Sequence, residues 1–421
     1  MKRLAVVLVA LVLVAGGAGA YVYAGGFGGH AAEPYALYPT AQQVSSWSFM
    51  AGQFDARVER GENPQLVFGS SELNAAPAGA THPGNLLAPG AYDLSVMMAG
   101  RAGCADLWHA IEIGAFAGRE AAPKRIVLFP SMQWFMCYRR PDQDFPGVFS
   151  RGAYDAFMAN GQIPDDLKQR VTERAQRYGV ACGSDALPPE LLARTVDEAA
   201  RSFVSDMRLA RDMERSQATD DPMAGADGPD AGASADAVFG MGPSGGKRGE
   251  ADAPDWDAVF AWAQAAAREK STNNDLGLND AWFSKKYEKW VAGAEKNWKV
   301  RDGAYFSEQE FEDFKMVLEV CRAVGVEPLV VLQPVKGAAY DRTIYTREVR
   351  AQYSAMMRDA CAEAGVAVAD VSSHEYDPFF LRDYSHPSEL GGAYYSKAIY
   401  TYLKTGVADI APSGGVEVPP R

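Results

Sequence analysis

The chain has 421 residues and a formal net charge of −13, from 41 Lys and Arg against 54 Asp and Glu. Hydrophobic residues make up 48% and charged residues 23%, the balance of an ordinary folded protein, which excludes disorder as the general state. A nucleic-acid-binding protein needs a basic face, so the acidic balance argues against nucleic acid as a partner.

The N-terminus predicts a membrane location. Lys2 and Arg3 precede an uncharged run over residues 4–24, about the length that a helix needs to cross a bilayer. We therefore expect residues 1–24 to be a single-pass N-terminal membrane anchor, with the rest of the chain extracytoplasmic. The alternative is a cleaved signal peptide, because small residues at 15–20 offer a peptidase site. Both alternatives place the remaining residues outside the cytoplasm.

The five cysteines are an odd number, so at least one thiol is free even if a disulfide forms. The chain has no CxxC and no paired His and Cys spacing, so we expect no metal site and no cofactor. Cys321 lies on the apolar stripe of a predicted helix, where it is expected to be a small buried hydrophobic residue.

Short apolar runs bounded by Gly or Pro predict five strands, at 66–69, 92–98, 125–130, 328–333 and 366–370. Continuous apolar runs of this kind are typical of parallel strands buried on both faces. Helical patterns separate them, at 106–116, after 307 and at 346–363. This alternation predicts an α/β fold with a central parallel sheet.

One helix start carries a specific signal. Ser307 and Glu310 have the spacing of a capping box, with Phe306 and Phe311 at the positions of a hydrophobic staple. The predicted helix ends at Gly325, just before the fourth strand.

The remaining residues divide the chain. Residues 25–60 are predicted to be a stalk and lead-in, 61–412 the catalytic domain, and 413–421 a tail. Residues 151–300 are predicted to be a helical insertion, with helices at 165–178, 188–213, 256–270 and 283–298. Within it, residues 216–255 are rich in Gly, Ala, Asp and Pro without aliphatic periodicity, which predicts a disordered acidic loop.

A candidate nucleophile follows the first strand, in Gly-Ser-Ser-Glu-Leu at 69–73. A serine on the turn after a parallel strand exposes its Oγ, and the N–H groups that open the next helix can hold an oxyanion. Ser71 is the preferred nucleophile, with its own N–H as an oxyanion donor, although the sequence alone does not exclude Ser70. The alternative is an ordinary Gly-Ser turn with a helix N-cap.

Asp383 and His386 lie three residues apart after the last strand. His386 could act as general base towards the serine, with Asp383 orienting it. An early Ser and a late Asp-x-x-His on an α/β sheet are the arrangement of SGNH/GDSL-type hydrolases. The alternative is a surface loop with an unrelated histidine.

Two further strand ends carry candidate oxyanion donors, the side-chain amide of Gln133 and the backbone N–H of Gly100. For Gln133 the alternative is that it only braces its loop, and for Gly100 that it is a turn glycine. Trp134 is a candidate for the cleft wall or the core.

Six motifs together resemble the DltD family: GSSEL (69–73), GRAG (100–103), SxQWF (131–135), STNNDLGLND (271–280), PVxG (334–337) and DxxH (383–386). The resemblance spans roughly residues 60–400 and the N-terminal anchor. It implies an SGNH-hydrolase-like three-layer fold with the triad Ser71, His386 and Asp383, in which Ser70 replaces the Asp of the family's GDS block. Three features depart from the family pattern: Met132 in place of Pro, Lys336 in place of Asn, and the acidic insertion.

The family resemblance implies D-alanyl transfer to lipoteichoic acid. The implied partners are a membrane acyltransferase, the D-alanyl carrier protein machinery and the lipoteichoic acid acceptor. A polyanionic acceptor predicts a local basic rim, with Arg101, Arg139, Arg140 and Lys336 as candidates. Ser70 and Trp134 are further candidate substrate contacts. Solvated surface charge is the alternative for each basic residue.

Two other functions remain open at this point. One is an extracellular esterase acting on wall polymers through the same triad. The other is a non-catalytic scaffold for the D-alanylation machinery.

Overall fold

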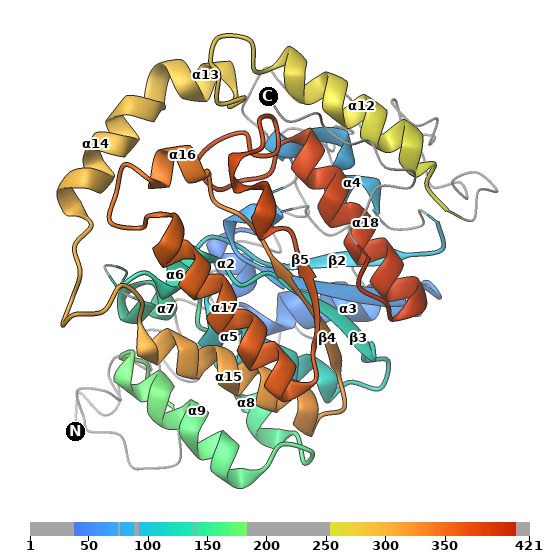
Figure 1. Ribbon diagram of the computed structural model, residues 1–421. Helices are drawn as coiled ribbons and strands as arrows, with labels where there is room; N and C mark the ends of the chain where they lie inside the picture. The colour runs from blue at the N-terminus through green and yellow to red at the C-terminus, as the bar shows by residue number, and fades with distance from the viewer. Residues whose placement is uncertain are drawn as a thin grey trace, which may run out of the picture.

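The computed structural model describes residues 38–74, 76–87, 92–137, 139, 141–182 and 253–409. Within these ranges, five strands form one sheet in the order β2-β1-β3-β4-β5, and every neighbouring pair is parallel (Figure 1). The strands are β1 (Pro64–Gly69), β2 (Ser95–Gly100), β3 (Arg125–Leu128), β4 (Glu327–Leu332) and β5 (Ala367–Asp370). The predicted α/β class with a central parallel sheet is confirmed.

The second strand begins later than its apolar run suggests. Tyr92 and Asp93 have φ angles of 52° and 56°, a left-handed conformation that no strand contains. The chain therefore turns at these two residues, and β2 starts at Ser95.

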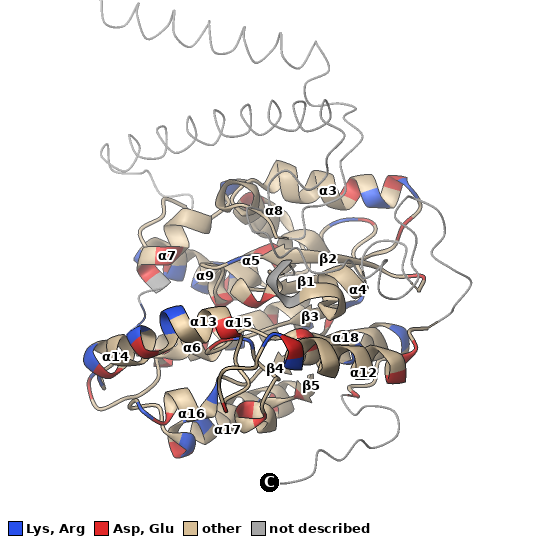
Figure 2. Ribbon diagram, turned by 90° about the horizontal axis from the view of Figure 1, so that it is seen from above, with Lys and Arg blue, Asp and Glu red and all other residues tan. Residues whose placement is uncertain are grey.

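Helices cover both faces of the sheet and make three layers (Figure 2). One face carries α3 (Trp47–Glu59), α5 (Asp106–Ala117), α8 (Arg151–Ala159), α9 (Asp165–Arg177), α15 (Glu308–Ala323) and α17 (Arg347–Ala364). The other face carries α4 (Pro83–Leu86), α12 (Trp256–Glu269) and α18 (Glu389–Thr405).

Shorter helices connect these layers. They are α2 (Ala41–Val44), α6 (Met132–Phe135), α7 (Pro141–Val148), α13 (Asp280–Trp282), α14 (Glu288–Asn297) and α16 (Gly337–Tyr340). Tighter or wider turns occur at Ser71–Leu73, Ala76–Thr81 and Ser372–Tyr376, which are 3₁₀-helical, and at Phe283–Tyr287, which is a π-helix. The region predicted as one helix at 283–298 is thus divided by the π-helical segment.

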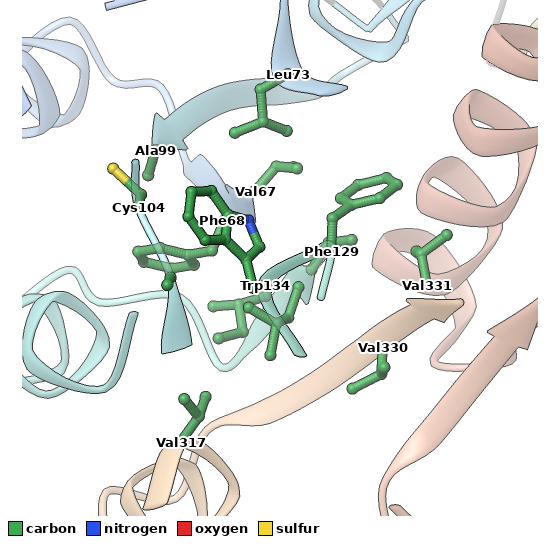
Figure 3. Packing of buried hydrophobic residues seen from close by; sticks show 14 of the residues in the cluster. Val67, Phe68, Leu73, Ala99, Cys104, Phe129, Trp134, Val317, Val330 and Val331 are labelled. Carbon is green, nitrogen blue, oxygen red and sulfur yellow. The ribbon is translucent and has the colours of Figure 1, made fainter. Parts of the chain in front are cut away.

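The core lies on both faces of the sheet, against α5 and α15 on one face and against α18 on the other. Val67, Phe68, Val330 and Val331 on the strands are fully buried, and Val317 of α15 lies on the side of β4 to which Val330 points (Figure 3). Cys321 on the same helix is also buried, as predicted. All five cysteines are free thiols, and all are buried.

The N-terminus of α15 forms only half of the predicted capping box. The Ser307 Oγ accepts a hydrogen bond from the Glu310 N–H at 3.2 Å. The Glu310 carboxylate does not return to Ser307, because it accepts from the Asp106 N–H of α5 at 3.1 Å. The Ser307 N–H instead donates to the Phe135 carbonyl at 2.6 Å. The helix is therefore capped and tied to two neighbouring elements at once.

Several predicted features lie outside the described residues: the anchor at 1–24, the helix at 188–213, residues 216–252 of the acidic loop, and the tail. The helix predicted at 256–270 is α12, which begins at Trp256 as predicted, and the Asp255 side chain caps it by accepting from the Ala258 N–H. No helix within the described ranges combines enough length with enough apolar character to cross a bilayer.

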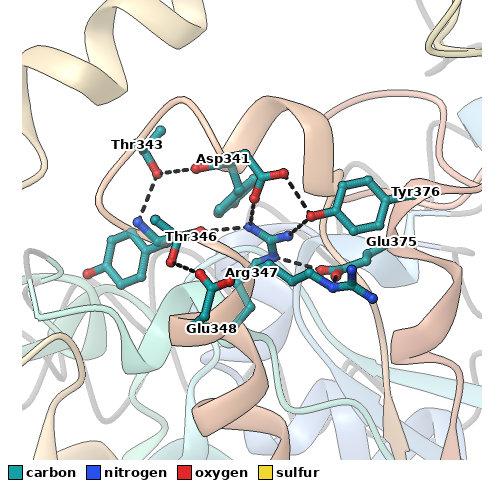
Figure 4. A network of polar contacts seen from close by, with 10 residues as sticks. Asp341, Thr343, Thr346, Arg347, Glu348, Glu375 and Tyr376 are labelled. Carbon is teal, nitrogen blue, oxygen red and sulfur yellow. Dashed lines mark hydrogen bonds and ion pairs between the residues drawn. The ribbon is translucent and has the colours of Figure 1, made fainter.

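A buried guanidinium braces the loop after β4. Arg350 of α17 donates to Glu375 at 2.7 Å, to Asp341 at 2.8 Å and to the Tyr376 hydroxyl at 3.0 Å (Figure 4). The Tyr376 hydroxyl in turn donates to Asp341 at 2.7 Å. This network joins α16, α17 and the turn after β5.

We expect Arg350→Met to lower the free energy of unfolding by about 3 kcal/mol, because the change leaves Asp341 without its cation and Glu375 with only Arg347 at 3.9 Å. Arg358 on the same helix pairs with Asp370 at the surface, and Arg358→Met should cost less than about 1 kcal/mol. Thermal or urea unfolding of both variants measures the difference. Equal losses would contradict the role given to the buried network.

A second prediction concerns Glu112 of α5, which is fully buried with no hydrogen-bond partner for either carboxylate oxygen. Burial raises the pKa of Glu112 well above its usual value, so the folded protein holds a proton that the unfolded chain releases. Stability contributed by this group is therefore lost as the pH rises above about 4.5.

Glu112→Gln removes this titration. We expect the variant to exceed the wild type in unfolding free energy by about 1–3 kcal/mol at pH 7, with the difference shrinking towards pH 4. Exposed Glu363→Gln serves as the control, and its difference from the wild type should not grow with pH. A pH series of thermal unfolding midpoints checks this, and a constant offset for Glu112→Gln would count against it.

Candidate active site

The candidate site lies at the carboxyl end of the sheet, at the point where the connections between strands run to opposite sides of β1. From β1 the chain crosses to β2 on one side, whereas β3, β4 and β5 follow on the other. Ligands bind at such switch points in open α/β sheets. Ser71 opens the 3₁₀ turn directly after β1, so the fold delivers it to this crevice.

The structure brings together the three residues predicted as a triad. The His386 Nε2 lies 2.9 Å from the Ser71 Oγ, across 315 positions of sequence. The His386 Nδ1 lies 2.9 Å from each Asp383 carboxylate oxygen. A carboxylate can only accept, so Nδ1 carries the hydrogen and Nε2 is free to accept the serine proton.

The loop around Asp383 holds its carboxylate ionised. Burial alone would raise the pKa of Asp383, but the hydrogen bond from His386, the charge of Arg382 and the Ser385 N–H together lower it below its usual value. The Ser385 and His386 N–H groups each donate to the Asp383 Oδ1 at 2.9 Å. The acid is therefore oriented by its own loop before it orients the imidazole.

Ser70 has a different place from Ser71. It is buried, and its Oγ lies 3.4 Å from the Arg101 carbonyl rather than at the imidazole. Its N–H donates to the Glu72 carboxylate at 2.5 Å. The structure thus gives Ser70 no contact with the crevice of the kind predicted for a substrate-binding residue.

Glu72 and His82 support this turn, and the sequence reasoning missed both. Burial raises the pKa of Glu72, and its carboxylate lies where a Cβ on Gly69 would come within 2.5 Å. The His82 ring accepts from the Gly84 N–H, so its other nitrogen donates to the Glu72 carbonyl at 2.9 Å. Glu72 belongs to the GSSEL motif, which was the available signal.

Gly100 pairs with Gly69 at the ends of β2 and β1. Its φ is +138°, and a Cβ there would lie 2.0 Å from the Gly69 carbonyl oxygen. Glycine is therefore required at this position for close approach of the two strand ends. Gly100 is thus the last residue of a paired strand beside the loop that carries Ser71, and its role as an oxyanion donor stays a prediction.

Gln133 and Arg139 line a groove of about 770 Å³, whereas the predicted cleft residue Trp134 is not part of its lining. Gln133 lines it and donates its side-chain amide to the Tyr340 hydroxyl at 3.2 Å. Trp134 is buried, with the Arg139 guanidinium 4.7 Å above its ring. Arg139 also lines the groove and pairs with Asp144 at 3.3 Å.

Two residues predicted for a basic rim are turned away from open solvent. Arg101 donates to the Pro39 carbonyl at 3.1 Å and lies against the Tyr38 ring. Lys336 is buried, its Nζ donates to the Asp377 carbonyl at 3.0 Å, and burial lowers its pKa to about 8. Arg140 lies outside the described residues.

The STNNDLGLND stretch holds the loop that carries Asp383 and His386. The Asn279 N–H donates to the Arg382 carbonyl at 2.9 Å, and the Phe379 N–H donates to the Gly277 carbonyl at 3.2 Å. The Asp280 carboxylate accepts hydrogen bonds from the Thr272 and Asn273 N–H groups, so the two ends of the stretch are bonded to each other. Residues 271–280 thus brace the segment just before Asp383, a role that the sequence did not reveal.

Fold and site together define an α/β protein with a hydrogen-bonded Ser-His-Asp triad at the carboxyl edge of a parallel sheet. The family model described as DltD protein matches residues 41–404. The chain therefore belongs to the DltD family, whose members take part in the D-alanylation of teichoic acid.

Two relatives extend over most of the chain. Protein DltD of Bacillus subtilis (strain 168) is 27% identical over 355 residues, covering 81% of this chain and 82% of the relative. Protein DltD of Staphylococcus aureus (strain NCTC 8325 / PS 47) is 22% identical over 349 residues, covering 80% of each.

Proposed function

We propose that this chain is an extracytoplasmic acyltransferase that places D-alanyl groups on lipoteichoic acid through Ser71, His386 and Asp383. The observation that carries the proposal is the pair of hydrogen bonds at 2.9 Å that link Ser71 to His386 and His386 to Asp383. Membership of the DltD family supplies the acyl group and the acceptor class.

The first step loads the enzyme. The Ser71 Oγ attacks the carbonyl carbon of the D-alanyl donor while the His386 Nε2 takes its proton. The Ser71 and Gly100 N–H groups, with the Gln133 amide, hold the negative charge that develops on the carbonyl oxygen. The bond to the donor then breaks, the leaving group takes the proton from His386, and the D-alanyl ester remains on Ser71.

The second step delivers the acyl group. A hydroxyl of the teichoic acid gives its proton to the His386 Nε2 and attacks the ester carbon. The Ser71 Oγ leaves and recovers the proton, so that a D-alanyl ester of the polymer forms and the triad is regenerated. Asp383 stays ionised throughout and stabilises the imidazolium in both steps.

The proposal includes a place in the cell. Residues 1–24 anchor the chain in the membrane, and the folded part faces outward. Its partners are a membrane acyltransferase and the D-alanyl carrier protein machinery that supply the acyl group. The reaction as written needs no cofactor.

The test is complementation of a host strain that lacks its own DltD-family protein. We expect the wild type and Ser70→Ala to restore alkali-labile D-alanine on teichoic acid, and Ser71→Ala to fail although it is made and membrane-bound. The chain must function with the proteins of the host, so a chimera that carries the N-terminus of the host's own DltD-family protein is tested in parallel.

Other outcomes identify the alternatives. Restoration by all three forms would make the triad dispensable and favour a scaffold. Loss of D-alanine below the level of the deletion strain, with ready hydrolysis of simple acetyl esters by the purified protein, would favour an esterase.

A further inference from the structure

A groove of about 770 Å³ lies along α13, the π-helical segment and α14, and Tyr384 of the loop that carries Asp383 and His386 lines it. Its walls carry a concentration of positive charge in a protein whose net charge is −13. Lys285, Lys286 and Lys289 line one side, and Arg139 lines it as well. In Figure 2, blue segments recur along α14 and the turn that joins it to α13.

The three lysines are exposed and uncompensated. Within the described part of the chain, none of their ammonium groups lies within ion-pair distance of a carboxylate. The nearby acids Glu288 and Glu295 are instead paired with Arg342, each at 3.3 Å. The positive charge of the groove is therefore available to a ligand.

The backbone arranges these lysines on one face. A π-helical segment spans Phe283–Tyr287 and carries Lys285 and Lys286, and Lys289 follows three and four positions later on α14. Residues at such spacing lie next to each other on a helix surface. Single-turn π-helical segments are frequent at functional sites, because they re-aim side chains at the cost of regular hydrogen bonding.

The groove is separated from His386 by the ring of Tyr384. Tyr384 lines the groove and stacks on Trp290, with ring centroids 4.7 Å apart and an interplanar angle of 18°. The same Tyr384 ring meets the His386 ring edge-on at 5.7 Å. A ligand seated between the lysines and Tyr384 therefore lies one aromatic ring away from the His386 imidazole.

We propose that this groove is the acceptor subsite: Lys285, Lys286, Lys289 and Arg139 bind consecutive phosphodiesters of a poly(glycerol phosphate) chain and direct its hydroxyl to Ser71. The inference rests on the proposed function and names the part of the molecule that recognises its acceptor. Ammonium and guanidinium groups suit phosphate oxygens, and the aromatic walls leave room for the uncharged glycerol units. The basic rim expected from the sequence thus lies chiefly on the helical insertion.

The test uses the full chain in detergent and soluble poly(glycerol phosphate) as the probe. The variant Lys285→Gln/Lys286→Gln/Lys289→Gln removes three charges from the groove. A matched control, Lys124→Gln/Lys168→Gln/Lys315→Gln, removes three charges elsewhere. We expect the groove variant to bind the polymer about tenfold more weakly or worse at low salt, with a shallower salt dependence, and the control to bind like the wild type.

A second readout separates this proposal from the proposed function. The rate at which a fluorophosphonate probe labels the active serine should be unchanged in the groove variant, because the probe needs the triad but not the polymer. Unchanged polymer binding by the groove variant would overturn the inference, as would equal weakening in the control. Failure of the proposed function would instead appear as D-alanine restored by Ser71→Ala, whatever the polymer binding.

An anionic lipid headgroup offers the same phosphodiester chemistry, so one arm distinguishes the two sources. Phosphatidylglycerol is added to the detergent micelles at the same phosphate concentration as the polymer. The inference predicts that the polymer stays bound through the lysines. Displacement of the polymer by the lipid would assign the groove to the membrane and overturn the acceptor subsite.

Discussion

Asp383→Asn should slow labelling of the active serine by about 10³-fold to 10⁴-fold, because an amide favours the wrong tautomer of His386. In the wild type, the ionised Asp383 accepts the hydrogen of the His386 Nδ1 at 2.9 Å and leaves Nε2 to accept from Ser71. An Asn that donates its NH₂ to Nδ1 moves the ring hydrogen to Nε2, where it cannot accept the serine proton.

A second His and Asp pair provides the control for this prediction. The His374 Nδ1 lies 2.6 Å from the Asp377 Oδ2 with the same spacing of three residues, outside the candidate triad. Asp377→Asn should therefore label within about twofold of the wild type, since it contacts neither His386 nor Ser71. The rate of fluorophosphonate labelling measures both variants. Equal rates in Asp383→Asn and wild type would remove Asp383 from the mechanism.

Gly100→Ala should be the most disruptive glycine substitution near the site. The residue has a φ of +138°, and the added Cβ would lie 2.0 Å from the Gly69 carbonyl oxygen, with no side chain that could move aside. Separation of the ends of β1 and β2 moves the turn that carries Ser71. We expect a loss of at least about 3 kcal/mol in unfolding free energy and a roughly 100-fold slower labelling rate.

Gly52→Ala is the matched control, because it lies within α3 and an added Cβ meets nothing within 4 Å. That variant should gain about 0.5–1 kcal/mol, since alanine favours the helix. Thermal unfolding measures the change in stability of both glycine variants, and fluorophosphonate labelling measures the change in reactivity of the serine. A Gly100→Ala protein with wild-type stability and labelling would contradict the close approach of the two strands.

Local patterns were sufficient for the parallel sheet and most of its helices. Strands buried between helices appear in the sequence as short apolar runs. Helix ends are marked by glycines such as Gly325 and Gly365, whose φ values are +69° and +68°. The pattern could not reveal the interruption at Phe283–Tyr287, because a π-helical segment keeps helical composition while shifting the spacing by one residue.

The candidate triad was predictable because the chain has only five histidines, and because the serine and the Asp-x-x-His follow strand ends in the expected order. The supporting residues were less visible. Glu72 holds the Ser70 N–H from within the same motif, and Asn279 reaches the Arg382 carbonyl from a loop about a hundred residues away in sequence. Contacts such as that of Asn279 with Arg382 depend on how distant segments of the chain pack together, and no local sequence pattern records that packing.

The residues predicted for a basic rim show the same limit of prediction from local sequence patterns. Arg101 and Lys336 follow strand ends, which favoured them as acceptor contacts, yet both side chains are held by backbone carbonyls. The lysines of the groove lie on the helical insertion, which contacts the loop of Asp383 and His386 through the stacking of Trp290 on Tyr384. Their role therefore emerges only from the packed structure.

The central claim is that Ser71 is a nucleophile activated by His386, and labelling with peptide mapping tests it most directly. The full chain is treated with a fluorophosphonate probe, digested, and the modified peptide is sequenced by mass spectrometry. The account predicts modification of Ser71 in the wild type and in Ser70→Ala, and none in Ser71→Ala. Modification of Ser70 in the wild type, or undiminished labelling of Ser71→Ala, would contradict it.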